Sequence, residues 1–291
     1  MLVGGIVQNV YKHIPVIFSF LESLKTIFPD LQVCIYENNS TDWTKKGLLE
    51  RKVEYIDILC EDYEDSFFLN FPARTYDNKP CRIHKIACAR NRLLKMIEKY
   101  SAEFVMFIDF DFNIAPNPNA ILFAINNFPK EADVLFANGI GKNGHYYDGY
   151  SLRTTTHPYG PEILGEEFWS DNHMQHLQPK IDPYSNPISV VSAFGGLAIY
   201  RAKAIAGCFY SAEVTDELHE FYSKYSIQPT VQTHSNGCSL GVYLKDMKIF
   251  YRNNSGYNFP IVAEHVSFNL MVRKKGFDKM FICPFLYYYW N

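Results

Sequence analysis

Short apolar runs alternate with segments of helical spacing over the first part of the chain. Residues 2–10 form a short apolar run that ends in polar residues, and residues 31–36 are short and apolar, as buried strands are. Residues 14–28 instead repeat apolar side chains at helical intervals. A strand, a helix and a second strand in this order form a parallel crossover unit. Residues 52–59 alternate between apolar and polar and predict a third strand. We therefore expect an α/β fold in which helices flank a mostly parallel central sheet.

The pattern continues with a predicted helix at residues 85–100 and a buried strand at residues 104–108. Residues 60–84 are aromatic, charged and interrupted by proline, so we expect a loop there. Elements beyond residue 112 are less regular: strands at 132–138 and 279–290, a helix at 263–276, an irregular stretch at 168–187, and two apolar pieces within 188–202 that are hinged at Gly195 and Gly196. No internal repeat is present, so we expect a single domain, residues 1–291, whose two halves share one sheet.

Two aspartates, Asp109 and Asp111, directly follow the most apolar strand, residues 104–108. Residues two apart in an extended chain point to the same side, and ligands of open α/β sheets bind outside the carboxyl ends of the strands. Carboxylate and phosphate oxygens are the ligands that Mg²⁺ and Mn²⁺ prefer. The alternative is a strand that simply ends in solvated acids. Charges between buried apolar residues are rare without a partner, so the sequence favours a metal site.

A polar segment, residues 37–42, follows the second predicted strand and reads Glu-Asn-Asn-Ser-Thr-Asp. A turn needs only one or two residues of this kind, although Ser40, Thr41 and Asp42 are also good helix N-caps. Because the carboxyl ends of parallel strands meet at one edge of a sheet, Glu37 should lie beside the two aspartates and could accept hydrogen bonds from a base or ribose hydroxyl. Together the two segments predict a ligand-binding edge.

Composition excludes several classes of protein. The net charge of −3, with no long basic run among 291 residues, makes nucleic acid an unexpected partner. Seven scattered cysteines without a C-x-x-C pair argue against a disulfide framework or a structural zinc site. We expect a soluble chain in the cytoplasm or another reducing compartment, with no transmembrane segment, which could be one domain of a longer or membrane-associated protein.

The order of these segments resembles nucleotide-sugar glycosyltransferases of the GT-A fold, which is Rossmann-like, including glycosyltransferase family 2. In that fold the second strand commonly ends in an acidic Ser-Thr-Asp loop and the central strand ends in Asp-x-Asp. Residues 146–153, 192–201 and 263–269 are similar to segments of the capsule-associated mannosyltransferase type. The resemblance covers most of the chain and does not identify the sugar.

The resemblance implies a nucleoside diphosphate sugar, UDP- or GDP-linked, bound by residues 1–112, and a glycan or glycoconjugate acceptor bound by residues 113–291. Asp109 and Asp111 would hold Mn²⁺ or Mg²⁺ against the phosphates of the donor. This chain has Glu37-Asn38 where two aspartates are usual, which leaves the base open. The residues expected to contact the donor are Val7, Gln8, Asn9, Glu37, Asp42, Arg90 and Asp109.

Glu264 and His265 stand at the start of a predicted helix. The resemblance implies that Glu264 is the base that deprotonates the acceptor hydroxyl in an inverting reaction and that His265 completes the metal site. The alternative for this pair is a capping glutamate and a buried, hydrogen-bonded histidine. We predict the catalytic assignment, with retention of configuration as the other possible course.

Further polar and aromatic residues in the second half are candidates for binding the acceptor or the donor sugar. The paired glycines indicate close approach of the backbone to a ligand or to another strand. The predicted acceptor and sugar residues are Asp148, Arg153, Trp169, Asp171, Gly195 and Gly196.

Two other functions are possible on this sequence. A sugar nucleotidyltransferase would normally carry a Gly-rich, basic loop after its first strand, and residues 3–9 place the glycines before the polar end of the strand. A non-catalytic carbohydrate-binding or scaffold protein would not need Asp109-x-Asp111. The predicted function is therefore a metal-dependent glycosyltransferase.

Overall fold

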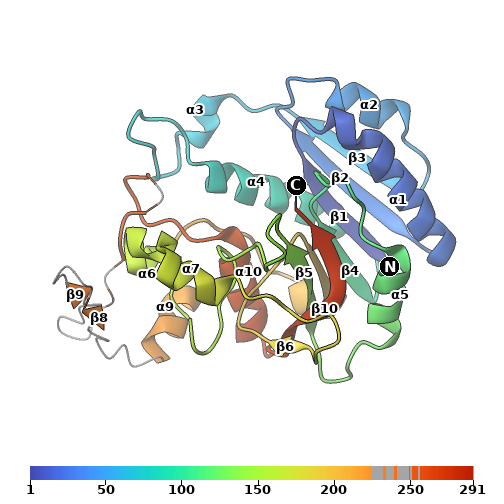
Figure 1. Ribbon diagram of the computed structural model, residues 1–291. Helices are drawn as coiled ribbons and strands as arrows, with labels where there is room; N and C mark the ends of the chain where they lie inside the picture. The colour runs from blue at the N-terminus through green and yellow to red at the C-terminus, as the bar shows by residue number, and fades with distance from the viewer. Residues whose placement is uncertain (225–231, 234–238, 241–248, 250, 255, 291) are drawn as a thin grey trace.

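An eight-stranded sheet with helices on both faces forms the framework of the molecule (Figure 1). The structure is a computed structural model, and it describes residues 1–224, 232–233, 239–240, 249, 251–254 and 256–290. The strands of the large sheet are β1 (Leu2–Val7), β2 (Gln32–Asn38), β3 (Ile56–Glu61), β4 (Phe104–Ile108), β5 (Val134–Ile140), β6 (Ile188–Ser189), β7 (Leu197–Arg201) and β10 (Met280–Tyr289). A separate pair consists of β8 (Gln232–Thr233) and β9 (Ser239–Leu240).

The helices of the described residues vary from single turns to four turns. They are η1 (Tyr11–His13), α1 (Ile14–Ile27), α2 (Thr44–Glu50), α3 (Asp65–Phe68), α4 (Arg82–Ile97), α5 (Pro118–Asn126), α6 (Pro161–Leu164), η2 (Gly165–Trp169), α7 (Asp171–Leu177), α8 (Ala202–Ile205), α9 (Asp216–Lys224) and α10 (Glu264–Lys274). None of the helices in these ranges combines the length and the apolar character that a membrane span requires.

The strand order is β3-β2-β1-β4-β7-β5-β10-β6. β1 pairs in parallel with β2 and β4, β2 pairs in parallel with β3, and β5 pairs in parallel with β10. β7 lies antiparallel between β4 and β5, and β6 lies antiparallel to β10. The predicted α/β fold with a mostly parallel sheet is confirmed, and strands from both halves of the sequence join in the one sheet.

In the first half the strands and the helices α1 and α4 were predicted, but α2 was not, and the expected loop at residues 60–84 contains α3 and the first residues of α4. The second half also contains helices that were not predicted. α7 lies in the stretch expected to be irregular; it begins after Ser170, whose side chain accepts a hydrogen bond from the His173 backbone. α5 and α9 were also not predicted. The start of α5 had a readable signal, since Pro118 occupies the first turn and Asn117 caps the helix by accepting from the Asn119 N–H.

A hydrophobic core covers each face of the sheet. On one face α1 contributes Ile17, Leu21 and Leu24, and α5 packs beside it. On the other face α4 contributes Leu93 and α10 contributes Phe268 (Figure 1). Each fully buried side chain of this kind stabilises the fold by about 1.5–3 kcal/mol relative to exposure. The two layers hold the sheet rigidly, so the loops at its carboxyl edge have fixed starting points.

Gly195 and Gly196 lead into β7 with positive φ angles of 65° and 86°. A Cβ atom at Gly195 would lie 2.3 Å from the Ala137 carbonyl oxygen, and one at Gly196 would lie 2.3 Å from the Tyr288 ring. The close approach expected of these glycines is therefore an approach to other strands of the sheet.

We expect Gly196→Ala to destabilise the protein by about 2–5 kcal/mol, since it combines left-handed backbone strain with overpacking against Tyr288. Urea unfolding measures this loss. The matched control is Gly207→Ala. Gly207 has a φ of 71°, and a Cβ added there would meet no atom of the described residues within 4 Å, so only the backbone strain of about 1–2 kcal/mol applies. Equal losses in the two variants would show that contact with Tyr288 costs nothing.

Candidate functional site

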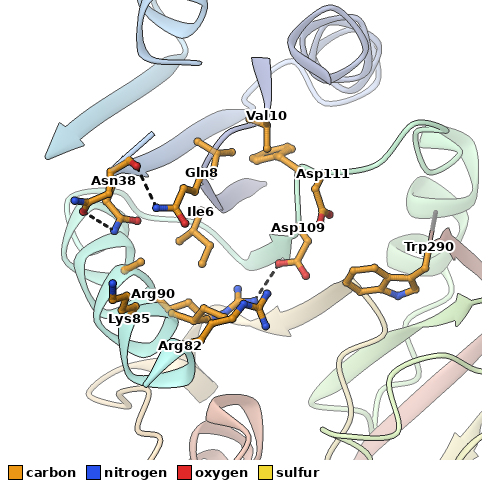
Figure 2. A pocket seen from close by; sticks show the side chains of 15 residues that line it. Ile6, Gln8, Val10, Asn38, Arg82, Lys85, Arg90, Asp109, Asp111 and Trp290 are labelled. Atoms are coloured by element: carbon orange, nitrogen blue, oxygen red, sulfur yellow. Dashed lines mark hydrogen bonds and ion pairs between the residues drawn. The ribbon is translucent and has the colours of Figure 1, made fainter. Parts of the chain in front are cut away.

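A cavity of about 300 Å³ opens at the carboxyl edge of the sheet, above the ends of β1, β2 and β4 (Figure 2). This is the edge at which open α/β sheets bind their ligands. Its lining residues are Ile6, Val7, Gln8, Val10, Asn38, Asn39, Arg82, Lys85, Ile86, Ala89, Arg90, Asp109, Phe110, Asp111 and Trp290. The cavity thus gathers polar side chains from four separate parts of the chain.

Asp109 and Asp111 are positioned by the alternation of the chain beyond β4. Phe110 and Phe112 between and after them are buried, so the two acids lie on the cavity side. The Asp109 N–H donates to the Gly196 carbonyl oxygen at 3.0 Å. The Tyr288 hydroxyl contacts both the Asp109 carbonyl oxygen, at 2.9 Å, and the Asp111 Oδ1, at 3.0 Å. Asp109 is therefore anchored to the residue before β7 and to β10, and Asp111 is anchored to β10.

Arg90 joins two acids beneath the cavity. Its Nη2 donates to Asp109 Oδ1 at 3.0 Å and its Nε donates to Glu264 Oε1 at 3.1 Å. The guanidinium lies over the Phe194 and Tyr210 rings, at 5.0 and 5.6 Å from their centroids, and only 4% of the residue is exposed. Its Nη1 is buried without a hydrogen-bond partner in the described residues. A permanent cation is thus fixed against the wall of the cavity.

Burial raises the pKa of Asp109 to about 7, opposed by Arg90 and assisted by the negative charges of Asp111 and Glu264. The carboxylate form is therefore more costly here than at the protein surface. A cation bound in the cavity would lower the free-energy cost of the charged carboxylate. Asp109 therefore has the environment expected of a carboxylate beside a metal ion or a positively charged side chain.

Two further cations line the cavity from the first turns of α4. Arg82 and Lys85 are three residues apart, and Ala89 and Arg90 lie two turns further along the same face. The Lys85 Nζ also contacts Asp65 Oδ1 at 2.6 Å. The helix therefore presents positive charge to the cavity, opposite the two aspartates.

Side-chain amides of Gln8, Asn38 and Asn39 line the end of the cavity above β1 and β2. The Gln8 Nε2 donates to the Asn39 carbonyl oxygen at 3.3 Å (Figure 2). Asn39 has a φ of 57°, and its side chain is tied to the backbone of Tyr63 by two hydrogen bonds of 2.6 and 3.2 Å. Amides both donate and accept, which suits the mixed edge of a base.

The other polar residues predicted to contact the donor make hydrogen bonds within and between the loops that follow β1 and β2. The Asn9 Oδ1 accepts from the Thr41 N–H, and the Glu37 Oε1 accepts from the Ser40 N–H, each at 2.8 Å. Asp42 accepts from the backbone N–H groups of Tyr11 and Thr44. None of Asn9, Glu37 and Asp42 lines the cavity, whereas Val7, Gln8, Arg90 and Asp109 do.

Glu264 and His265 begin α10, as predicted, and lie below the cavity lining. Glu264 is 6% exposed and holds Arg90. The His265 ring stacks on Phe194 with centroids 3.7 Å apart, and burial keeps its pKa well below the ordinary value. Within the ranges that the structure describes, no three His, Cys, Asp or Glu side chains are arranged to hold a metal ion. The structure therefore does not bring His265 to the two aspartates.

The residues predicted for the acceptor lie outside the cavity lining. Asp148 Oδ2 accepts from the Gly195 N–H at 3.1 Å. Arg153 is fully buried and pairs with Glu162 at 3.5 Å, so in this conformation it cannot touch a ligand. Trp169 is 40% exposed, and Asp171 is exposed at the start of α7.

Several cavity residues were not predicted from the sequence. The cationic face of α4 could have been predicted from helical spacing, because Arg82 and Lys85 lie one turn apart. Trp290 could not, because it reaches the cavity only through the pairing of β10 with β5, an element from a distant part of the chain. Tyr288, which contacts both aspartates, was missed for the same reason.

Asp109 and Asp111 fit a divalent cation that is shared with a ligand. Mg²⁺ and Mn²⁺ are commonly held in proteins by one or two carboxylates together with phosphate oxygens of the substrate. Two oxygen-ligand residues beside three cationic side chains therefore suit a metal that arrives with an anionic ligand.

No protein-family model matches the chain, and no curated protein matches it in sequence. Solved structures resemble it in fold. S. aureus TarS 1-349 is 17% identical over 72% of this chain and 50% of that one, with a TM-score of 0.40. The mannosyltransferase PcManGT from Pyrobaculum calidifontis, solved with GDP-Man and Mn²⁺, is 12% identical over 72% and 47%, with a TM-score of 0.40.

A third similar structure is glucosyl-3-phosphoglycerate synthase from Mycobacterium tuberculosis, solved with Mn²⁺, UDP and phosphoglyceric acid. It is 14% identical over 71% of this chain and 57% of that one, with a TM-score of 0.38. The match thus spans about half the length of these proteins. The likeness concerns the fold alone. Function depends on the residues of the cavity itself.

Proposed function

We propose that the chain is a metal-dependent glycosyltransferase that moves a sugar from a nucleoside diphosphate sugar to a hydroxyl of a glycan or glycoconjugate. The observation that supports this most is the composition of the cavity. It combines two carboxylates, the cations of Arg82, Lys85 and Arg90, and three side-chain amides. These groups correspond to the metal, the diphosphate and the nucleoside of such a donor.

In this proposal the nucleoside binds over β1 and β2, where Gln8 and Asn38 supply donors and acceptors and the Asn39 side chain is held by the Tyr63 backbone. The diphosphate lies between the cationic face of α4 and the two aspartates. Mn²⁺ or Mg²⁺ held by Asp109 and Asp111 would stabilise negative charge on the departing diphosphate as a Lewis acid.

Arg90 is the group that fixes the charge balance of the site, and Glu264 orients it. Because Glu264 is buried and bonded to Arg90, we assign it a positioning role. The inverting course, with Glu264 as base, stays a prediction from the sequence, as do the acceptor contacts of Trp169 and Asp171. In this proposal oxygen atoms of the donor, and not His265, complete the coordination of the metal.

The first experiment is calorimetric titration of the protein with UDP, GDP and their common sugars, with and without Mn²⁺, together with nucleoside triphosphates, sugar phosphates and a glycan array. We expect one of the two nucleotides to bind with micromolar affinity only when the metal is present. Binding of a nucleoside triphosphate and a sugar phosphate in place of these would favour a nucleotidyltransferase. Absence of any nucleotide binding, with glycan binding retained, would favour a carbohydrate-binding scaffold and overturn the proposal.

A further inference from the structure

Trp290 closes one end of the cavity. It directly follows β10, and its backbone N–H donates to the Ile140 carbonyl oxygen at 2.9 Å. The indole projects toward Asp109 from the side of the cavity opposite Lys85 (Figure 2). An aromatic ring therefore stands next to the acidic end of the cavity, where the cationic face of α4 ends.

Two tyrosines hold the indole in place. The Tyr147 ring packs on it with centroids 4.6 Å apart and an interplanar angle of 31°, and the Tyr288 ring lies at 5.1 Å. Tyr288 in turn donates to Asp111, so the indole has a fixed position relative to that carboxylate. Tyr147 is anchored by its N–H to the Gly139 carbonyl oxygen at 2.8 Å.

The indole offers carbon surface to the cavity. Its Nε1 is buried, without a hydrogen-bond partner in the described part of the chain, so the ring carbons are what a ligand would meet. The indole is partly buried, Tyr147 behind it is exposed, and the ring lines the cavity together with Asp109 and Asp111. A ligand that fits must have an apolar face and a polar edge, which is the character of a pyranose ring with its C–H face and its hydroxyl groups.

We propose that Trp290, backed by Tyr147, is a stacking platform for a pyranose ring next to Asp111. This inference rests on the proposed function, which sets how the donor lies in the cavity. With the nucleoside over β1 and β2, the end of the cavity at Trp290 lies beyond the diphosphate. The pyranose ring belongs either to the donor sugar or to the terminal sugar of the acceptor, and the experiment separates these two sources.

The test compares Trp290→Ala, Trp290→Phe and the control Trp43→Ala, since Trp43 is 63% exposed and outside the cavity lining. Calorimetry with Mn²⁺ gives the affinities for the nucleoside diphosphate and for its nucleotide sugar. If the donor sugar stacks there, Trp290→Ala keeps the diphosphate affinity within about twofold and weakens the nucleotide sugar by about tenfold. If the acceptor sugar stacks there, both affinities persist and the KM for the acceptor rises by about tenfold.

Trp290→Phe retains an aromatic face and is expected to recover most of either loss, whereas Trp43→Ala is expected to behave as wild type. The proposal is overturned if Trp290→Ala changes none of these constants, or if it weakens the bare diphosphate as much as the nucleotide sugar, which is the result of a purely structural role.

A failure of the proposed function gives a different result, because the wild-type protein then binds no nucleotide. The platform is in that case tested alone, by titration with methyl pyranosides and short oligosaccharides at millimolar concentration and tryptophan fluorescence. Quenching that is present in wild type and lost in Trp290→Phe supports the platform without the transferase. No saccharide response in wild type overturns the platform as well.

Discussion

Replacing Asp111 with asparagine is expected to abolish Mn²⁺-dependent binding of the nucleotide sugar and to lower transfer by at least about 10³-fold, or roughly 4 kcal/mol of transition-state stabilisation. The amide has the shape of the carboxylate and keeps an oxygen that can accept from the Tyr288 hydroxyl, which now donates to Asp111 Oδ1. The fold should therefore persist while the negative charge toward the metal is lost. Calorimetry with and without Mn²⁺, together with single-turnover transfer, measures the effect.

The matched control is Asp30→Asn, because Asp30 is an exposed acid in the turn before β2, at the opposite edge of the sheet. It should leave both the affinity and the rate unchanged. If Asp111→Asn retained the metal-dependent affinity within a few-fold, Asp111 would not be a metal ligand, and the assignment of the acidic end of the cavity would have to be abandoned.

Replacing Arg90 with methionine is expected to destabilise the protein by about 3–5 kcal/mol and to remove donor binding. The loss follows because Asp109 and Glu264, which Arg90 now pairs at 3.0 and 3.1 Å, would lie in a largely buried setting without their cation, at the cost of an unpaired charge or of proton uptake. Urea unfolding followed by fluorescence measures the stability, and calorimetry measures the affinity for the donor.

Glu264→Gln separates the two roles considered for Glu264. The amide oxygen can still accept from the Arg90 Nε, so the loss of stability should be smaller, about 1–2 kcal/mol. A positioning role predicts that donor affinity and kcat fall together. A fall in kcat by orders of magnitude with unchanged donor affinity would identify Glu264 as the base instead, and an unchanged protein in both Arg90→Met and Glu264→Gln would contradict the buried ion-pair network.

The fold of the first half could be predicted because its information is local. β4 is an uninterrupted apolar run, and α1 repeats apolar side chains at helical spacing, so each element is visible in a short window. Asp109 and Asp111 were found for the same reason, since they stand directly at the end of a readable strand. The antiparallel direction of β7 was not readable, because it depends on which strands flank it.

Roles that depend on packing were not predictable from residue type. Arg153 has the chemistry of a ligand-binding residue, but the folded chain buries it against Glu162. Glu37 belongs to a polar loop that favours binding, yet its carboxylate accepts from the Ser40 N–H of the same loop. Trp290 and Tyr288 reach the cavity only after β10 has joined the sheet. The sequence pattern identified the edge of the sheet at which the cavity lies, and tertiary packing decides which side chains reach it.

The antiparallel strand β7 also limits how the protein can move. Five registered pairs join it to β4 and three join it to β5, so residues 1–112 and residues 113–291 share an unbroken ladder. Hinge bending of one half over the other would have to break these pairs, whereas two-domain enzymes close across a flexible linker. In the proposed function, enclosure of the donor would therefore depend on local rearrangement of loops at the carboxyl edge of the sheet, while the sheet beneath stays fixed.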